Sequence, residues 1–131
     1  MKLLLDTHIW IWSRSQQERL ASSVALELEN PENELWLSPL SVWEFLLLLE
    51  RGRLTRESSI EDWFTMRVGA ALLREAAVTY EVALETRQVQ LPHRDPIDRL
   101  LAATARVYDL TLVTADERLM GVKGLRVLAN R

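Results

Sequence analysis

The sequence contains no cysteine, and this absence removes two kinds of site from consideration. Without thiols the chain can form neither disulfide bonds nor thiolate metal centres. A metal ion would have to be bound by oxygen atoms or by the two histidines, His8 and His93. Any metal site is therefore expected to hold a hard cation, because hard cations prefer oxygen ligands.

Long apolar runs and chain-breaking residues are also scarce. The longest uninterrupted apolar stretch is residues 45–49, far short of the roughly 18 residues that a membrane-spanning helix needs. The chain has four glycines, four prolines, 48% hydrophobic and 27% charged residues, which is typical of a folded globular protein. We expect one domain over residues 1–131, located in the cytoplasm and not attached to a membrane.

A strongly basic surface is missing as well, since the formal net charge is -3. Nucleic-acid-binding proteins tend to carry a basic footprint, so this charge argues weakly against such a partner. However, 14 of the 16 basic residues are arginine, whose planar fork suits bidentate contact with phosphate. Bound divalent ions would also neutralise several acids, so a nucleic-acid substrate is not excluded.

Short apolar runs that end at polar residues predict buried strands. They lie at residues 3–5, 35–37, 110–113 and 125–128, with a weaker candidate at 77–80. Amphipathic helical patterns with recognisable starts lie between them, at about 17–29, 38–51, 58–72 and from residue 95 onward. This alternation predicts an α/β fold, a four- or five-stranded parallel sheet flanked by helices on both faces. Ligands of such sheets bind beyond the carboxyl ends of the strands.

Two aspartates follow predicted strands at that edge. Asp6 comes directly after the strand at 3–5, and Asp116 comes three residues after the strand at 110–113. Either residue alone is as readily explained as a helix N-cap or a turn former. Together they indicate where a functional site would lie.

Glu44 is harder to explain by structure alone. It lies two turns into the helix predicted from Ser38, among neighbours that are almost all apolar. A helix that is apolar on every side is expected to be buried. No basic residue stands three or four places away, and an unpaired buried charge costs several kcal/mol. Glu44 is therefore protonated, paired with a remote arginine or bound to a cation, and the pattern favours the cation.

Asp98 is the fourth acid, in the first turn of the helix that Asp95 and Pro96 open. The helix dipole alone would stabilise a carboxylate there by about 0.3–1 kcal/mol. All four acids nevertheless map to one edge of the sheet, where their mutual repulsion would raise their pKa values. Mg²⁺ or Mn²⁺ would remove that repulsion, so the sequence predicts a metal site.

Four segments in this order resemble a known family over nearly the whole chain. They read LLLDTH at residues 3–8, SPLSVWE at 38–44, LPHRDPIDRLLA at 91–102 and LVTAD at 112–116. The chain thus resembles a PIN domain, of the subgroup that forms the toxin half of VapBC-type toxin–antitoxin modules. The resemblance implies a PIN-like fold, a homodimer, a cognate antitoxin and Mg²⁺- or Mn²⁺-dependent endoribonuclease activity on single-stranded RNA.

The resemblance also assigns roles to individual residues. The family's acidic, metal-binding quartet corresponds here to Asp6, Glu44, Asp98 and Asp116. Thr114 matches the hydroxyl residue that supports the quartet, and one or two cations would activate a water that attacks phosphorus in line. His93 and Asp95 belong to a subgroup signature for which we expect structural loop contacts. Contacts with RNA phosphates or with the antitoxin are expected from Arg14, Arg19, Arg51, Arg53 and Arg56.

Other functions share parts of this pattern. A DNA-directed or structure-specific nuclease would use the same metal site, and the acids cannot separate it from a ribonuclease. A receiver-like signalling domain also gathers acids and Mg²⁺ at strand ends. The chemistry of such a domain, phosphorylation of an aspartate, resembles cases that need a lysine at the same edge of the sheet. The two lysines here, Lys2 and Lys123, both precede predicted strands, which makes this alternative the weaker one.

Overall fold

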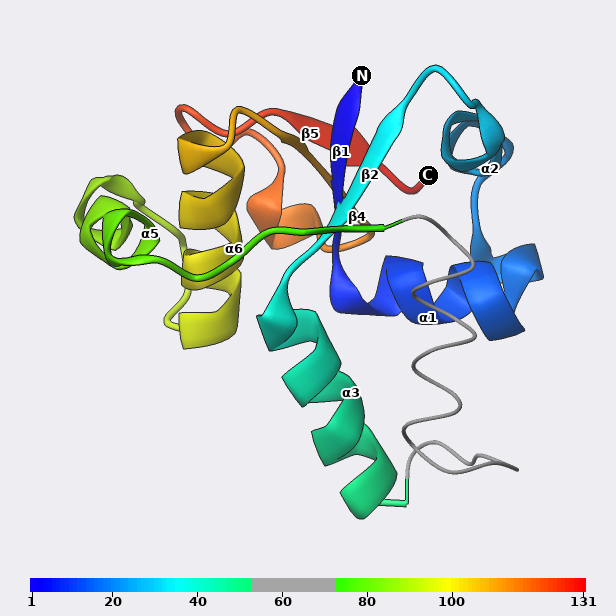
Figure 1. The fold of residues 1–131 in the computed structure, drawn as a ribbon, viewed down its shortest axis with the longest axis horizontal. Helices are drawn as coiled ribbons and strands as arrows, with labels where there is room; N and C mark the ends of the chain where they lie inside the picture. Colours follow the sequence, from blue (N-terminus) through cyan, green and yellow to red (C-terminus); the bar gives the residue numbers. More distant parts are fainter. Residues whose placement is uncertain (53–72) are drawn as a thin grey trace.

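The structure, a computed structural model, describes residues 1–52 and 73–131. Within these residues five parallel strands form one sheet in the order β3-β2-β1-β4-β5 (Figure 1). The strands are β1 Lys2–Leu5, β2 Glu34–Leu37, β3 Arg74–Glu75, β4 Thr111–Thr114 and β5 Val127–Ala129. The predicted parallel α/β sheet is confirmed, with β1 at its centre.

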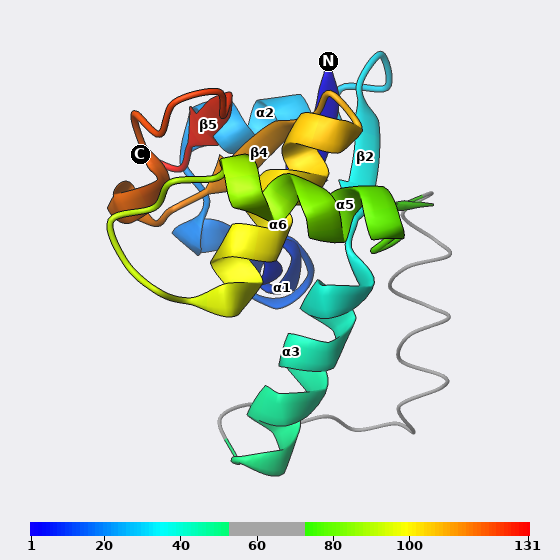
Figure 2. The same ribbon diagram turned by 90° about the vertical axis from the view of Figure 1, so that its left-hand side faces the viewer.

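Helices cover both faces of this sheet. The described helices are α1 Thr7–Ser15, α2 Ser22–Glu29, α3 Pro39–Glu50, α5 Tyr80–Glu85 and α6 Pro96–Val107, with 3₁₀ turns η1 Gln17–Arg19, η3 Thr86–Gln88 and η4 Glu117–Leu119. Helices α1 and α2 lie on one side and α5 and α6 on the other (Figures 1 and 2). None of the described helices is long and apolar enough to cross a membrane.

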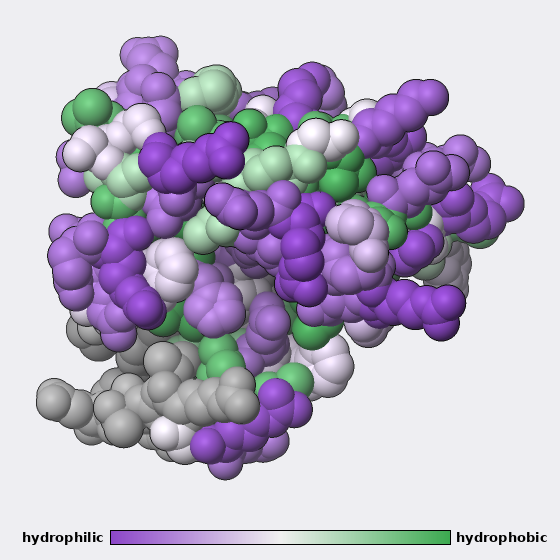
Figure 3. Space-filling model, turned by 180° about the vertical axis from the view of Figure 1, so that it is seen from behind, coloured by the Kyte–Doolittle hydropathy of each residue, from purple (hydrophilic) through white to green (hydrophobic). Residues whose placement is uncertain are grey.

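The alternation of side chains along β1 explains the two layers. Leu3 and Leu5 pack with Trp10 of α1, whereas Leu4 between them packs with Leu101 of α6. These five side chains are at most 2% exposed, as expected for a strand with helices on both faces. The surface seen from behind is accordingly mostly hydrophilic, with small apolar areas between polar side chains (Figure 3).

Two helices near the carboxyl edge of the sheet begin at the predicted caps. The Ser38 hydroxyl accepts a hydrogen bond from the amide of Leu40 at 3.0 Å, and Asp95 accepts one from the amide of Ile97 at 2.9 Å. Each cap is followed by a proline in the first helical turn, where a missing N–H costs nothing. These caps determine where α3 and α6 start relative to the strand ends.

Helix α3 corrects one prediction. The helix projects away from the sheet beyond the carboxyl ends of the strands (Figures 1 and 2). Of its residues only Ser41 and Phe45 are buried, and Trp43 is 52% exposed. The expectation that this helix is buried on every side is wrong for the described residues, because no second layer of them covers its outer face.

Three further differences concern local structure. The weak strand predicted at 77–80 is wrong, since the last strand before α5 ends at Glu75 and the Thr79 hydroxyl caps α5 through the amide of Val82. The single helix predicted at 17–29 is instead η1 followed by α2, and α1 was not predicted. The helix predicted at 58–72, together with Arg53 and Arg56, lies outside the described residues.

Candidate functional site

An open cavity of about 380 Å³ lies at the carboxyl ends of β1 and β4. All four acids singled out from the sequence line it. Its lining consists of Asp6, His8, Trp12, Glu44, Asp95, Asp98, Ala115, Asp116 and Arg118. The structure therefore brings together the acids that the strand-end rule placed on one edge.

Asp6 is held by the two central strands. Its amide donates to the carbonyl of Val113 on β4 at 3.0 Å, and its carboxylate accepts from the amide of Thr7 at 2.8 Å. The fully buried Thr114 hydroxyl donates to the other carboxylate oxygen at 2.6 Å and accepts from the amide of Asp116 at 3.1 Å. Thr114 thus connects two of the acids, in the place expected of the supporting hydroxyl.

Burial and a neighbouring negative charge act on the pKa of Asp6 in the opposite direction to these hydrogen bonds. Removal from water raises the pKa of Asp6 above its ordinary value. Hydrogen bonds from Thr114 and Thr7 lower the pKa, and repulsion from Asp116 raises it further. The metal-free site therefore holds an ionised Asp6 at a free-energy cost.

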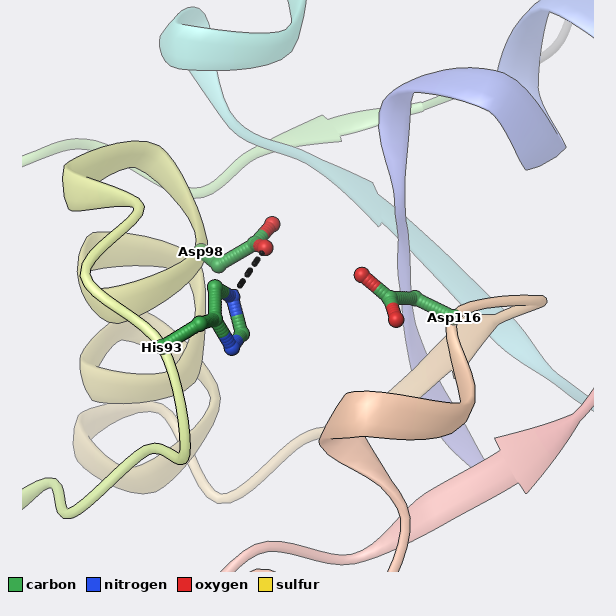
Figure 4. A group of neighbouring side chains, drawn as sticks. All are labelled: His93, Asp98 and Asp116. Atoms are coloured by element: carbon green, nitrogen blue, oxygen red, sulfur yellow. Dashed lines mark hydrogen bonds and ion pairs between the residues drawn. The ribbon is translucent and has the colours of Figure 1, made fainter.

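Asp98, on the other side of the cavity, also has a raised pKa. It stands in the first turn of α6 and is 9% exposed, so burial raises its pKa. The Nε2 atom of His93 lies 2.8 Å from Asp98 Oδ2 and lowers the pKa, whereas Asp95, Asp6 and Asp116 raise it (Figure 4). A structural loop contact was expected of His93, but its partner is Asp98, an acid of the cavity.

Asp116 is instead matched by a cation. It caps η4, and its carboxylate accepts from Arg118 Nε at 3.0 Å and from Nη2 at 2.8 Å. These hydrogen bonds hold the pKa of Asp116 below its ordinary value. Arg118 was not singled out from the sequence, where its position two residues after a predicted acid was the available signal.

Glu44 reaches the cavity from α3. Its side chain makes no hydrogen bond or ion pair within residues 1–52 and 73–131, so none of the described arginines is the remote partner that the sequence left open. It is half-buried rather than enclosed, because α3 projects from the body of the molecule. Glu44 is therefore a carboxylate at the rim of the cavity without a charged partner in the part of the chain that the structure describes.

The donor set fits a hard divalent cation. Ligand atoms of His93, Asp98 and Asp116 all lie within 4.8 Å of one another, and Figure 4 shows Asp116 facing Asp98 across the cavity. Carboxylates that repel one another in a buried position gain from a bound cation, and carboxylate oxygens are the ligands that Mg²⁺ and Mn²⁺ prefer. Of the predicted quartet, Asp98 and Asp116 belong to this cluster together with His93, whereas Asp6 and Glu44 line the same cavity outside it. The metal-binding role of all four acids stays a prediction.

Three of the five arginines named from the sequence are among the described residues, and none of the three lines the acidic cavity. Arg14 lines a separate cavity between α1 and α2, Arg19 lies over the Trp12 ring at 4.8 Å, and Arg51 follows α3. Contacts of these arginines with RNA or antitoxin stay a prediction. Neither lysine lines the acidic cavity, so the receiver-like alternative gains no support.

Comparison with known proteins gives a consistent picture. The sequence profile of the PIN domain matches residues 3–125. The chain is 32% identical over 120 residues to Ribonuclease VapC22 of Mycobacterium tuberculosis, a match that covers 89% of this chain and 88% of that protein.

Solved structures share the fold. VapBC2 from Rickettsia felis, bound to a DNA fragment from its promoter, matches with a TM-score of 0.70 at 16% identity, over 98% of both chains. A toxin–antitoxin complex from Klebsiella pneumoniae matches with a TM-score of 0.65 at 20% identity, again over 98% of both. On the strength of the profile and the sequence relative, this chain belongs to the PIN-domain family, in its VapC-like group.

Proposed function

We propose that this protein is a metal-dependent endoribonuclease that cuts single-stranded RNA and acts as the toxin of a toxin–antitoxin pair. The observation that carries the proposal is the convergence of four acids on one open cavity at the carboxyl edge of the sheet. The name of the sequence relative, Ribonuclease VapC22, supports RNA as the substrate.

The residues of the cavity divide the chemical work. Asp6, Glu44, Asp98 and Asp116 would hold Mg²⁺ or Mn²⁺, which when bound lowers the pKa of water and neutralises charge on the phosphate. Thr114 orients the carboxylate of Asp6, and His93 orients that of Asp98. Such oriented ligands matter because catalysis of phosphoryl transfer depends mainly on positioning and charge.

The proposal extends to partners and location. A cognate antitoxin is supported by the shared fold with a solved toxin–antitoxin complex. A homodimer is supported by the partly exposed apolar helix α3, on which Trp43 is 52% exposed. Sedimentation at rising concentration tests the dimer, and a monomer at the highest concentration would contradict it. A cytoplasmic location, where RNA is present, belongs to the same proposal.

The decisive experiment compares RNA with single-stranded DNA of the same sequence. Each is incubated with wild-type protein, Asp6→Asn and Asp109→Asn in Mg²⁺, Mn²⁺ or EDTA. Asp109 is a matched control, because it lies outside the cavity and its left-handed φ of 58° suits asparagine. Wild type and Asp109→Asn should cut RNA only with metal, and Asp6→Asn should not.

Each other outcome has a definite meaning. Cleavage in EDTA, or full activity of Asp6→Asn, would contradict a metal-dependent mechanism. Equal cleavage of the DNA strand would favour a DNA-directed or less selective nuclease over a ribonuclease.

A further inference from the structure

Arg118 is a cation held at the mouth of the acidic cavity by local structure. Asp116 caps η4 by accepting the amide of Arg118 at 2.9 Å, and the fully buried Leu119 anchors the same turn. The turn directs the arginine side chain back onto the carboxylate that caps it. The position of the guanidinium therefore follows from a capped turn and not from a chance surface encounter.

The guanidinium engages both oxygens of Asp116. Nε donates to Oδ1 at 3.0 Å and Nη2 donates to Oδ2 at 2.8 Å, which is a fork-like pair of charge-assisted hydrogen bonds. A divalent ion bound by Asp116 would stand beside this positive charge and be repelled by it. Glu44, by contrast, has no partner in the described residues, and Asp98 accepts a hydrogen bond only at Oδ2.

The rest of the guanidinium remains available. Arginine carries five N–H donors, and Asp116 uses only those of Nε and Nη2. Nη1 contacts no other group in the described residues, and the side chain is 57% exposed. Nη2 also lies 3.9 Å from Asp98 Oδ2, so the charge stands between two acids at the mouth of the cavity.

We propose that Arg118 takes the place of a second divalent ion, so that Asp6, Glu44 and Asp98 hold one metal ion while Asp116 holds the guanidinium, which contacts the RNA phosphate. This inference rests on the proposed function, because it concerns the same cavity and the same substrate. The charge that a second ion would supply to the phosphate comes from the chain itself.

A surface ion pair elsewhere in the molecule provides a matched control. Arg126 Nη2 lies 2.7 Å from Asp109 Oδ1, and the Arg126 side chain is 61% exposed, close to the 57% of Arg118. Arg126 lines a different cavity, with no member of the quartet. If Arg118 were only a surface ion pair, removing it should have the same effect as removing Arg126.

The experiment counts bound Mn²⁺ by electron paramagnetic resonance in wild type, Arg118→Ala, Arg118→Lys and Arg126→Ala. Wild type and Arg126→Ala should bind one ion, Arg118→Ala two, and Arg118→Lys one because its charge is kept. With saturating Mn²⁺, RNA cleavage should fall at least about tenfold in Arg118→Ala. Arg118→Lys should lie between this variant and wild type, because lysine keeps the charge but not the fork.

Each contrary result overturns a stated part. Two ions in wild type, or one ion bound with unchanged affinity in Arg118→Ala, would overturn the replacement of the second ion. Unchanged cleavage in Arg118→Ala would overturn the phosphate contact. Cleavage by a wild type that binds no Mn²⁺ would instead defeat the metal-dependent function, whatever Arg118 does.

Discussion

Replacing Thr114 with valine tests whether its hydroxyl or its volume matters. Valine has nearly the same shape but neither donates to Asp6 nor accepts from the amide of Asp116. A hydrogen bond to a charged group contributes about 1.5–3 kcal/mol, and a buried unsatisfied amide costs about 1–3 kcal/mol. Part of this loss is offset because the buried hydroxyl itself disappears. We expect Thr114→Val to lower the free energy of unfolding by about 2 kcal/mol at pH 7 in EDTA.

Thr114→Ser provides the opposite change. Serine keeps the hydroxyl and both hydrogen bonds but removes one buried methyl group, which costs about 1 kcal/mol. The order of stability should therefore be threonine, then serine, then valine. If packing alone decided the outcome, valine would be more stable than serine.

Urea denaturation followed by tryptophan fluorescence measures this order, since the chain has five tryptophans. The midpoints of unfolding report stability alone only if the free energy of unfolding depends on urea concentration with the same slope in all variants. A loss of about 2 kcal/mol corresponds to a fall in Tm of roughly 6–8 °C for a domain of this size. RNA cleavage should follow the same order, because Asp6 loses its orienting donor. A valine variant at least as stable as the serine variant would refute the role of the hydroxyl.

Three further predictions follow from the site. The first concerns pH: since folding raises the pKa values of Asp6 and Asp98, the folded protein binds more protons than the unfolded chain above about pH 4. Their contribution to the free energy of unfolding in EDTA should therefore fall as pH rises through these raised pKa values. Asp98→Asn should make this fall less steep. An unchanged slope of the free energy of unfolding against pH would contradict the prediction. The lowered pKa of Asp116 acts in the opposite sense and only below about pH 4. Second, His93→Ala should raise the pKa of Asp98 further and shift the acidic limb of the pH–rate profile to higher pH. His93→Gln, which keeps a hydrogen-bond donor, should shift the limb less. Identical profiles for wild type and both variants would exclude a positioning role for His93. Third, Asp95→Ala should cost about 1 kcal/mol through loss of the α6 cap, and Asp95→Ser should restore most of it, as thermal melts can measure.

The sequence predicted those parts of the site that depend on chain direction. Asp6 and Asp116 follow buried strands of one parallel sheet, and parallel strands necessarily end at one edge. Their meeting could therefore be predicted before any coordinates were known, and so could the cap that places Asp98 in the first turn of α6. Their catalytic roles stay a prediction.

The remaining features depend on tertiary structure. The exposure of Glu44 could not be predicted, because an apolar helix looks the same whether it enters the core or projects from it. Helix α1 was missed because its sequence, THIWIWSRS, is rich in β-branched and aromatic residues that are typical of strands. The contact of Arg118 with Asp116 depends on the geometry of η4, which spacing alone does not reveal.

The hydrogen bond from the Asp6 amide to the carbonyl of Val113 ties one part of the cavity to the central strands, and we call this part the floor. The parts of the cavity that are not tied to the sheet form its rim. Asp6, directly after β1, forms the floor and is hydrogen-bonded to Thr114 of the neighbouring strand β4, so separating the two requires breaking the middle of the sheet. Glu44 and Arg118 form the rim, one on a projecting helix and the other on an exposed turn. Amide hydrogen exchange at Asp6 should thus be as slow as global unfolding. Under the proposed function, differences between one RNA and another would then be accommodated by the rim, while the floor keeps one shape for every substrate.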